Sequence, residues 1–281
     1  MIMRLLSKVF GKKSKTRVEI ARDAYERKDM KLHKTAHELQ AIGNEPWHKT
    51  GAGRYIGSAV YGASDGIVTT FAVVAGVAGA SLSPGVVLIL GFANLFADGF
   101  SMAVGDYLSS KSEKDYFKSE RDREAWEVEV TPEGETAEIR EIYRRKGLEG
   151  EQLDKMVEIV TANKELWIET MMHEELGMME DGETSPIKSS IVTFLSFVIA
   201  GFMPLAAYVF ASYIPVFRQN LFLSASVITG ATLFAVGALR QRITAVKWYL
   251  GGLEMLLVGG LSAAVAYFVG FLLKTIFGIS V

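Results

Sequence analysis

The chain contains no cysteine among its 281 residues. Disulfide bridges, zinc fingers, thiolate metal centres and cysteine nucleophiles are therefore excluded. Any metal site has to use carboxylate, imidazole, thioether, amide or backbone ligands. The chain also lacks a phosphate-binding loop, a nucleotide-binding fingerprint and a nucleophile elbow, so we expect neither an enzyme nor an ATP-driven pump.

An excess of charge of one sign is also missing. Lys and Arg total 30, Asp and Glu total 32, and the formal net charge is −2. No overall field attracts nucleic acid, and we expect no such partner. Hydrophobic residues make up 49% of the chain and charged residues 22%. This mixture is too apolar for an ordinary soluble domain and too charged for a chain that lies wholly in a membrane.

Five apolar stretches are long enough to cross a lipid bilayer as helices. They cover residues 55–80, 85–108, 189–213, 220–239 and 248–273. A buried helix of a soluble protein is the alternative for each stretch, but five of them in one chain favour membrane spans. The sequence predicts an all-α membrane protein with transmembrane helices one and two in 55–108 and helices three to five in 189–281.

Two polar regions accompany the spans, at residues 1–54 and 109–188. The first is basic and predicts an amphipathic helix over Asp23–Ile42, and the second carries 22 of the 32 acidic residues. Lys and Arg number 13 in the first region and 12 in the second, whereas the opposite side has only Arg218 and Lys274. The positive-inside rule therefore predicts a cytoplasmic N-terminus, a cytoplasmic acidic region and an outside C-terminus, in the cell membrane if the source is prokaryotic.

The acidic region 109–188 has the pattern of a helical domain. Helical runs are expected over Lys111–Val128, Pro132–Lys146 and Glu149–Leu176. Pro132 suits the first position of a helix, and the glycine at 147 ends that helix. We expect about three helices between the second and third spans.

Acidic residues occur inside three of the apolar stretches, namely Asp65, Asp98 and Glu254. A carboxylate in the bilayer centre costs at least about 2.5–3.5 kcal/mol, so such residues usually bind ions or relay protons. The first two spans contain no Lys or Arg, which favours function over a structural ion pair for Asp65 and Asp98. Glu254 lies near Arg240, and for it the pinning of two helices is an equal alternative.

The second span carries two stripes of period four. One is a ridge of small residues, Ala93, Ala97, Ser101 and Gly105, and beside it lie Asn94, Asp98, Met102 and Asp106. Small ridges let helices approach closely in lipid. We expect this ridge to pack on the small residues Ser58, Gly62 and Gly66 of the first span, which would align Asp65, Asp98 and Met102.

Carboxylates, an amide and a thioether together suit a divalent ion of intermediate hardness. Fe²⁺ and Mn²⁺ fit best, and Zn²⁺ and Co²⁺ are compatible with the same ligands. Because such carboxylates bind a metal only when deprotonated, the same groups can exchange protons for metal ions.

The acidic region offers a second group of metal-binding side chains. Its members are Glu120, Glu124 and Glu127 on one helix face, Glu135 and Glu138 one turn apart, and Met171 and Met172 shortly before Glu175. Each acid alone is more typical of a solvated helix face, and the methionine pair of a core. Together they suggest a cytoplasmic metal-binding domain.

Four motifs resemble the vacuolar iron transporter family. They are Asp65–Ala72, Ser101–Leu108, Lys111–Glu113 and Met171–Gly177. The resemblance runs from about residue 55 to 275 and leaves out the N-terminal extension. It implies a homodimeric carrier with five spans that moves Fe²⁺ and related ions out of the cytosol in exchange for protons.

The resemblance also implies roles for individual residues. Asp65 and Met102 correspond to the transport path, and the cytosolic metal ligands correspond to Glu124, Glu127, Glu135, Glu138, Glu175, Met171 and Met172. Some members have a glutamate where Asn94 stands here, and Asp98 one turn away offers a replacement carboxylate.

The sequence thus predicts a metal exporter that works by proton antiport. A membrane-anchored metal-binding or sensing protein that does not transport is one alternative, and a passive channel is another. An anchor does not need polar residues within its spans, so those residues favour transport.

Overall fold

The computed structural model describes residues 17–38, 55–179, 185–240 and 247–278, and all regular elements in these ranges are helices. The chain divides into two compact units, Met1–Gly51 and Ala52–Val281. The expected all-α class is therefore confirmed for the described residues.

The N-terminal unit contains two short helices, α2 (Arg17–Arg27) and α3 (Met30–Ala36). The single helix expected over Asp23–Ile42 is wrong, because Lys28 adopts a left-handed φ of 54° and interrupts it. Asp29 then caps α3, since its carboxylate accepts hydrogen bonds from two backbone N–H groups at 2.9 and 3.1 Å. Residues 39–42 lie outside the described ranges.

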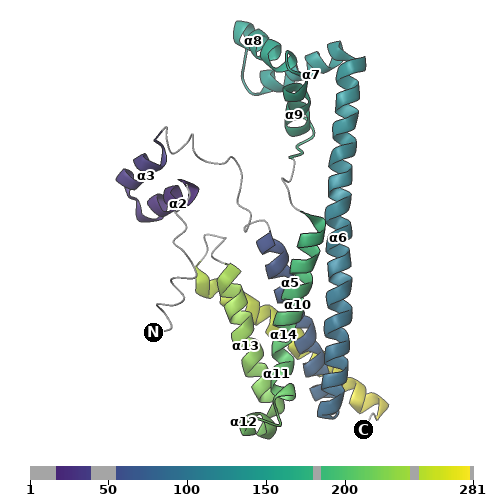
Figure 1. The fold of residues 1–281 in the computed structure, drawn as a ribbon. Coiled ribbons are helices and arrows are strands. Elements are labelled where there is room, and N and C mark those ends of the chain that lie inside the picture. The colour runs from purple at the N-terminus through teal and green to yellow at the C-terminus, as the bar shows by residue number, and fades with distance from the viewer. Residues whose placement is uncertain (1–16, 39–54, 180–184, 241–246, 279–281) are drawn as a thin grey trace. The chain divides into compact units, whose positions relative to one another are not determined.

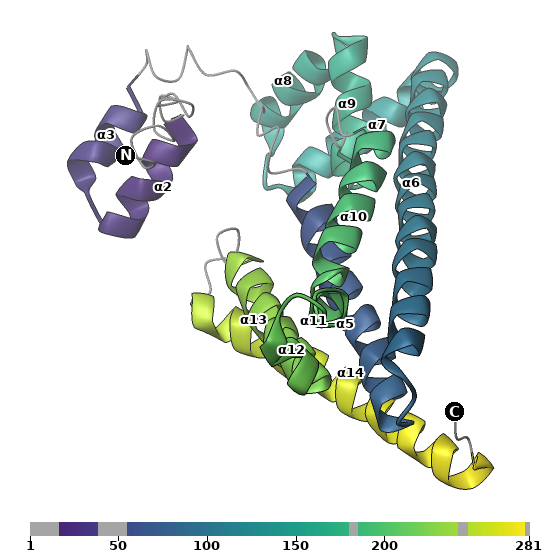
Figure 2. The same cartoon turned by 60° about the horizontal axis from the view of Figure 1, so that its bottom comes forward.

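The second unit holds the long apolar helices (Figures 1 and 2). They are α5 (Ile56–Gly79), α6 (Pro84–Val130), the pair α10 (Pro186–Gly201) and α11 (Met203–Val209), α13 (Leu221–Arg240) and α14 (Trp248–Phe277), with the short α12 (Pro215–Gln219) before α13. Among the described residues, four helices are long and apolar enough to cross a membrane, and a fifth span results if α10 and α11 count as one. The predicted set of five apolar spans agrees with this arrangement.

The third apolar stretch is not one continuous helix. Helices α10 and α11 meet at Phe202 with a bend of 44°. Pro204 stands in the first turn of α11, where a proline is tolerated but where it opposes the continuation of the helix that precedes it.

Helix α6 is continuous over 47 residues, from the second span far into the polar region. The helical run expected over Lys111–Val128 is confirmed as helix, and it continues the second span without a break. No glycine or proline stands between Gly105 and Val130, so nothing in the chain interrupts the helix there. At about 1.5 Å per residue, α6 is roughly 70 Å long, and Figure 1 shows it running from the long apolar helices to α7, α8 and α9.

Three helices pack at the far end of α6, namely α7 (Pro132–Arg145), α8 (Gly150–Thr161) and α9 (Lys164–Glu174). The first agrees with the predicted Pro132–Lys146, and the other two divide the predicted Glu149–Leu176. Their apolar side chains form a separate core with the last turn of α6, which includes Val128, Ile139, Val157, Trp167, Ile168 and Met171.

The small residues of α5 pack on α10. A Cβ atom on Gly62 would lie 2.4 Å from the carbonyl oxygen of Thr193, and one on Gly66 would lie 2.4 Å from that of Phe197. The hydroxyl of Ser58 also lies 2.8 Å from that of Ser189. The expected packing of these residues on the ridge of the second span is therefore wrong.

The ridge of α6 is left largely exposed. Ala93, Ala97, Ser101 and Gly105 are all exposed, and a Cβ on Gly105 would meet nothing within 4 Å. Helix α6 instead buries another face, where Gly91 meets Leu205 and Gly99 meets Phe197. The small-residue ridge thus has no partner among the described residues of this chain.

We predict that Gly66→Ala destabilises the protein by about 1–3 kcal/mol, because the added methyl group forces two helix backbones apart. The thermal midpoint in detergent measures this change. Gly57→Ala is the matched control, since a Cβ at residue 57 meets nothing within 4 Å. Equal midpoints for the two variants would contradict the close α5–α10 contact.

Candidate metal site and ion path

Asp65 and Asp98 lie near one another on two neighbouring spans. Asp65 lies on α5 and Asp98 on α6, both side chains are half-buried, and their carboxylates are close enough to repel each other. Within the described ranges, no Lys, Arg or His nitrogen lies within 4.0 Å of either carboxylate. The two acids expected to share a seam are therefore brought together without a basic partner.

Asn94 and Met102 lie one helical turn on either side of Asp98 on α6. The Asn94 Nδ2 atom is buried and has no hydrogen-bond partner in the described part of the protein. Met102 is half-buried against the apolar core of the spans. An amide, a carboxylate and a thioether thus follow one another along the side of α6 beside its exposed ridge.

Asp106 has a role that the sequence did not reveal. Its carboxylate accepts a hydrogen bond of 3.0 Å from the hydroxyl of Thr193, which is fully buried on α10. The bond ties α6 to α10. The spacing of Ser189 and Thr193, one turn apart on an otherwise apolar helix, is the signal that could have indicated a polar contact.

Glu254 is paired with a basic residue. An oxygen of its carboxylate lies 3.4 Å from Arg240 Nη2, so the pair joins the end of α13 to the first turns of α14. This geometry favours the pinning of two helices over a place on an ion path.

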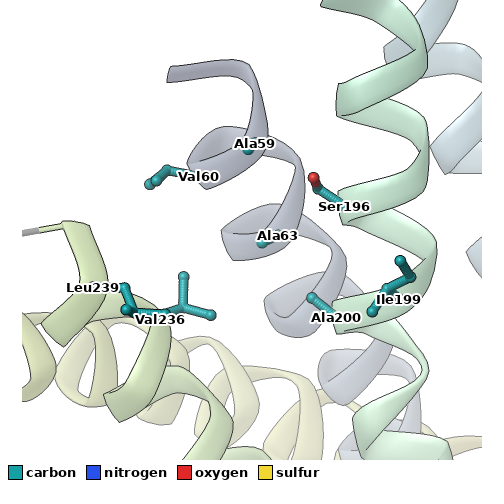
Figure 3. A pocket seen from close by; sticks show the side chains of 8 residues that line it. All are labelled: Ala59, Val60, Ala63, Ser196, Ile199, Ala200, Val236 and Leu239. Atoms are coloured by element: carbon teal, nitrogen blue, oxygen red, sulfur yellow. The ribbon is translucent and has the colours of Figure 1, made fainter. Parts of the chain in front are cut away.

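A cavity of about 310 Å³ lies between α5, α10 and α13 (Figure 3). Its lining residues are Ala59, Val60, Ala63, Ser196, Ile199, Ala200, Val236 and Leu239. Ser196 is the one polar side chain in that lining, and no acid takes part. The cavity therefore contains no acidic side chain that could bind a metal cation.

The polar region gathers glutamates from α6, α7 and the end of α9. Glu124 on α6 is 1% exposed, and neither of its carboxylate oxygens accepts a hydrogen bond from the described residues. Glu135 on α7 is 6% exposed and leaves one oxygen without a partner. Burial, and then the neighbouring carboxylates, raise the pKa of each of these two residues to about 7.

Three further glutamates act on this pair. Glu127, Glu138 and Glu175 all repel the Glu124 and Glu135 carboxylates, and burial together with Glu138 raises the pKa of Glu175. In the described ranges, however, no three Asp, Glu or His side chains converge closely enough to hold one metal ion. The five glutamates among the predicted ligands are thus neighbours, and side-chain rotation is needed for several of them to reach one ion.

The two methionines belong to the core of this domain. Met171 and Met172 are almost completely buried and pack with Trp167 and Ile168. This is the core role that the pair alone suggests. Glu120, the remaining candidate, contacts Arg123.

Comparison with known proteins identifies the family. A model of the VIT family matches residues 56–271. The chain belongs to the VIT family. The resemblance inferred from the four motifs is therefore confirmed.

Several relatives cover most of the chain. A protein of Toxoplasma gondii named vacuolar iron transporter is 37% identical over 270 residues, which cover 92% of this chain and 89% of the relative. A Plasmodium falciparum protein of the same name is 35% identical and covers 93% of this chain and 97% of its own length. Vacuolar iron transporter 1 of Oryza sativa is 34% identical over 77% of this chain and 84% of its own.

The N-terminal region is part of the similarity with the first two relatives. Their coverage of 92% and 93% is more than residues 56–281 alone could supply. The limit at about residue 55 that the motifs suggested is therefore too narrow for these relatives.

We predict that, with a chelator present, the thermal midpoint of the acidic domain falls as the pH rises from 5 to 8. Folding raises the pKa of Glu124 and Glu135 from 4.5 to about 7, so both stabilise the fold most below pH 4.5 and lose this contribution as the pH passes 7. Glu141, whose pKa Arg144 and Arg145 lower to about 2, titrates below this range.

The double variant Glu124→Gln and Glu135→Gln should flatten the dependence on pH, and Glu141→Gln should not. Thermal melts followed by circular dichroism measure the effect. A midpoint of the unaltered protein that stays constant or rises over the range would contradict the assigned shifts.

Proposed function

We propose that this protein carries divalent transition-metal ions, Fe²⁺ or Mn²⁺, from the cytosol across a membrane in exchange for protons. The observation that supports this most directly is the pair of neighbouring carboxylates of Asp65 and Asp98 on two apolar helices, without a basic partner in the described ranges. The relatives named vacuolar iron transporters support iron as the cargo.

Two carboxylates that repel each other in an apolar layer need a cation or a proton between them. A divalent ion would satisfy both charges of Asp65 and Asp98 at once. Asn94 and Met102 would then supply an oxygen and a sulfur ligand over about 12 Å of helix rise. A ligand set of this kind suits Fe²⁺ and Mn²⁺ better than Mg²⁺ or Ca²⁺, because a thioether is a soft ligand.

A second copy of the chain would complete the path. The ridge Ala93, Ala97, Ser101 and Gly105 is exposed on α6, and small residues are what lets two helices approach in lipid. The stripe with Asp98 borders this ridge. A homodimer that closes on the ridge would therefore enclose the polar stripe between its two protomers.

The glutamates of the acidic domain would capture ions on the cytosolic side. Glu124, Glu127, Glu135, Glu138 and Glu175 are neighbours at the end of α6, and this helix also carries Asp98. Because protons must leave carboxylates before a metal ion binds, both groups of acids provide a route to coupled proton movement.

We predict that Asp65→Ala abolishes metal flux in proteoliposomes, since it removes one of the two neighbouring carboxylates, and that Asp65→Asn reduces it by at least tenfold. Glu254→Gln is the matched control, because it also neutralises a carboxylate within a span but one that is paired with Arg240. Flux is measured with a fluorescent metal indicator inside the vesicles. Unchanged flux in Asp65→Ala would remove this residue from the mechanism.

We predict further that an imposed pH gradient drives metal ions against their own concentration gradient, and that a protonophore stops this. The same proteoliposomes serve for the measurement, with metal and proton indicators read together. Flux that follows the metal gradient alone would indicate a passive channel. Metal binding without flux in any condition would indicate a membrane-anchored sensor.

A further inference from the structure

Arg123 lies among the glutamates of α6 and contacts three of them. Its Nη2 atom lies 3.0 Å from Glu120 Oε2 and 2.9 Å from Glu124 Oε1, and its Nη1 atom lies 2.9 Å from Glu127 Oε2. Its Nε–H also donates a hydrogen bond of 3.0 Å to Glu120. One guanidinium thus joins two proposed metal ligands, Glu124 and Glu127, to a third carboxylate outside that set.

Other basic side chains of the domain are engaged elsewhere. They pair with acids that are not proposed ligands, in the pairs Arg121–Glu165, Arg140–Asp154, Lys146–Glu174, Lys164–Glu129, and Arg144 and Arg145 with Glu141. Among the described basic residues, Arg123 alone lies within 4.0 Å of a proposed ligand. Within the described ranges, Arg123 is therefore the basic side chain that a metal ion at this cluster would meet.

Arg123 cannot lose its charge when a metal ion approaches, because a guanidinium stays protonated in proteins. The Glu127 oxygen that accepts its hydrogen bond is not free to bind a metal ion at the same time. Glu124 is almost fully buried, and its Oε1 atom lies 2.9 Å from Arg123 Nη2. A dication that binds both carboxylates therefore has to move the guanidinium away from them.

Glu120 provides the place to which Arg123 can move. Two nitrogens of Arg123 already contact its Oε2 atom, and Glu120 is one turn further from the end of α6 than Glu124. The guanidinium can keep this pair while it releases the other two carboxylates. A small rotation of the side chain is sufficient, since all three acids lie on the same helix face.

We propose that Arg123 is an internal competitor of the metal ion, which holds Glu124 and Glu127 when no ion is bound and turns to Glu120 when an ion enters. The inference rests on the proposed metal binding by this cluster and adds the residue that sets its affinity. Competition from a fixed cation lowers the affinity and so eases release. Such release is what a site that passes ions onward requires.

The test measures the affinity of the full-length protein for Fe²⁺ under reducing conditions and for Mn²⁺, by isothermal titration in detergent. We expect Arg123→Gln to bind about tenfold more tightly, which corresponds to about 1.4 kcal/mol. Arg123→Lys keeps the charge and should stay within about threefold of the unaltered protein. Arg140→Gln is the matched control, because it removes an arginine of the same domain that pairs outside the cluster, and its affinity should not change.

Glu120→Gln provides a second test, which does not require that the Arg123→Gln protein folds. It should change the affinity for the metal ion in the opposite direction. Without Glu120, the guanidinium of Arg123 can pair only with Glu124 and Glu127, so the affinity for the metal ion should fall about threefold or more. In the Arg123→Gln background, the same substitution should have no effect, because Glu120 acts through the arginine. Weakening in both backgrounds would make Glu120 a ligand and overturn the inference.

The outcomes separate this inference from the proposed function. If the unaltered protein binds neither ion at the cluster, metal capture there fails together with the inference. If it binds and transports normally but Arg123→Gln binds equally or more weakly, only the inference is overturned. A loss of structural support would lower the affinity, so tighter binding by Arg123→Gln excludes a purely structural role, and the Glu120→Gln pair of measurements then tests the movement of the arginine.

Discussion

One unbroken helix, α6, connects the apolar spans to the polar helices, and both groups of candidate metal ligands depend on it. Helix α6 carries Asp98 in its apolar part and Glu124 in its polar part. These residues are 26 positions apart, which corresponds to about 39 Å of helix rise. Because no glycine or proline interrupts α6 between Gly105 and Val130, the helix carries α7 and α9 at its far end as one continuous element.

The close contact of α5 with α10 determines which helix surfaces of the spans remain exposed. Gly62 and Gly66 place the α5 backbone against Thr193 and Phe197 of α10, and Asp106 of α6 holds α10 through Thr193. Three spans are thereby joined through faces that leave the ridge of α6 open. In lipid, a ridge of small residues gains little from contact with acyl chains and much from contact with another helix.

The sequence predicted the spans and the acids within them, because long apolar stretches and misplaced charges are local signals. It did not predict which helix would meet the glycines of α5, since the α10 residues that meet them, Thr193 and Phe197, form no small-residue ridge that could be recognised in the sequence. The break at Phe202 was missed because high hydropathy continues across Pro204. The face with Glu120, Glu124 and Glu127 followed from helical spacing, whereas the approach of Glu135 and Glu175 depends on how α7 and α9 pack.

The glutamate cluster carries an imbalance of charge, which the packing of α6, α7 and α9 imposes. Five carboxylates lie close together, two of them almost fully buried, and they cannot all carry their charge without a compensating cation. Three kinds of cation are available to them: protons, the guanidinium of Arg123, and metal ions from solution. Because all three act on the same oxygens, the occupancy of each depends on the other two. If the cluster binds metal ions as proposed, its affinity depends jointly on pH and on Arg123, because the same buried carboxylates hold all three cations.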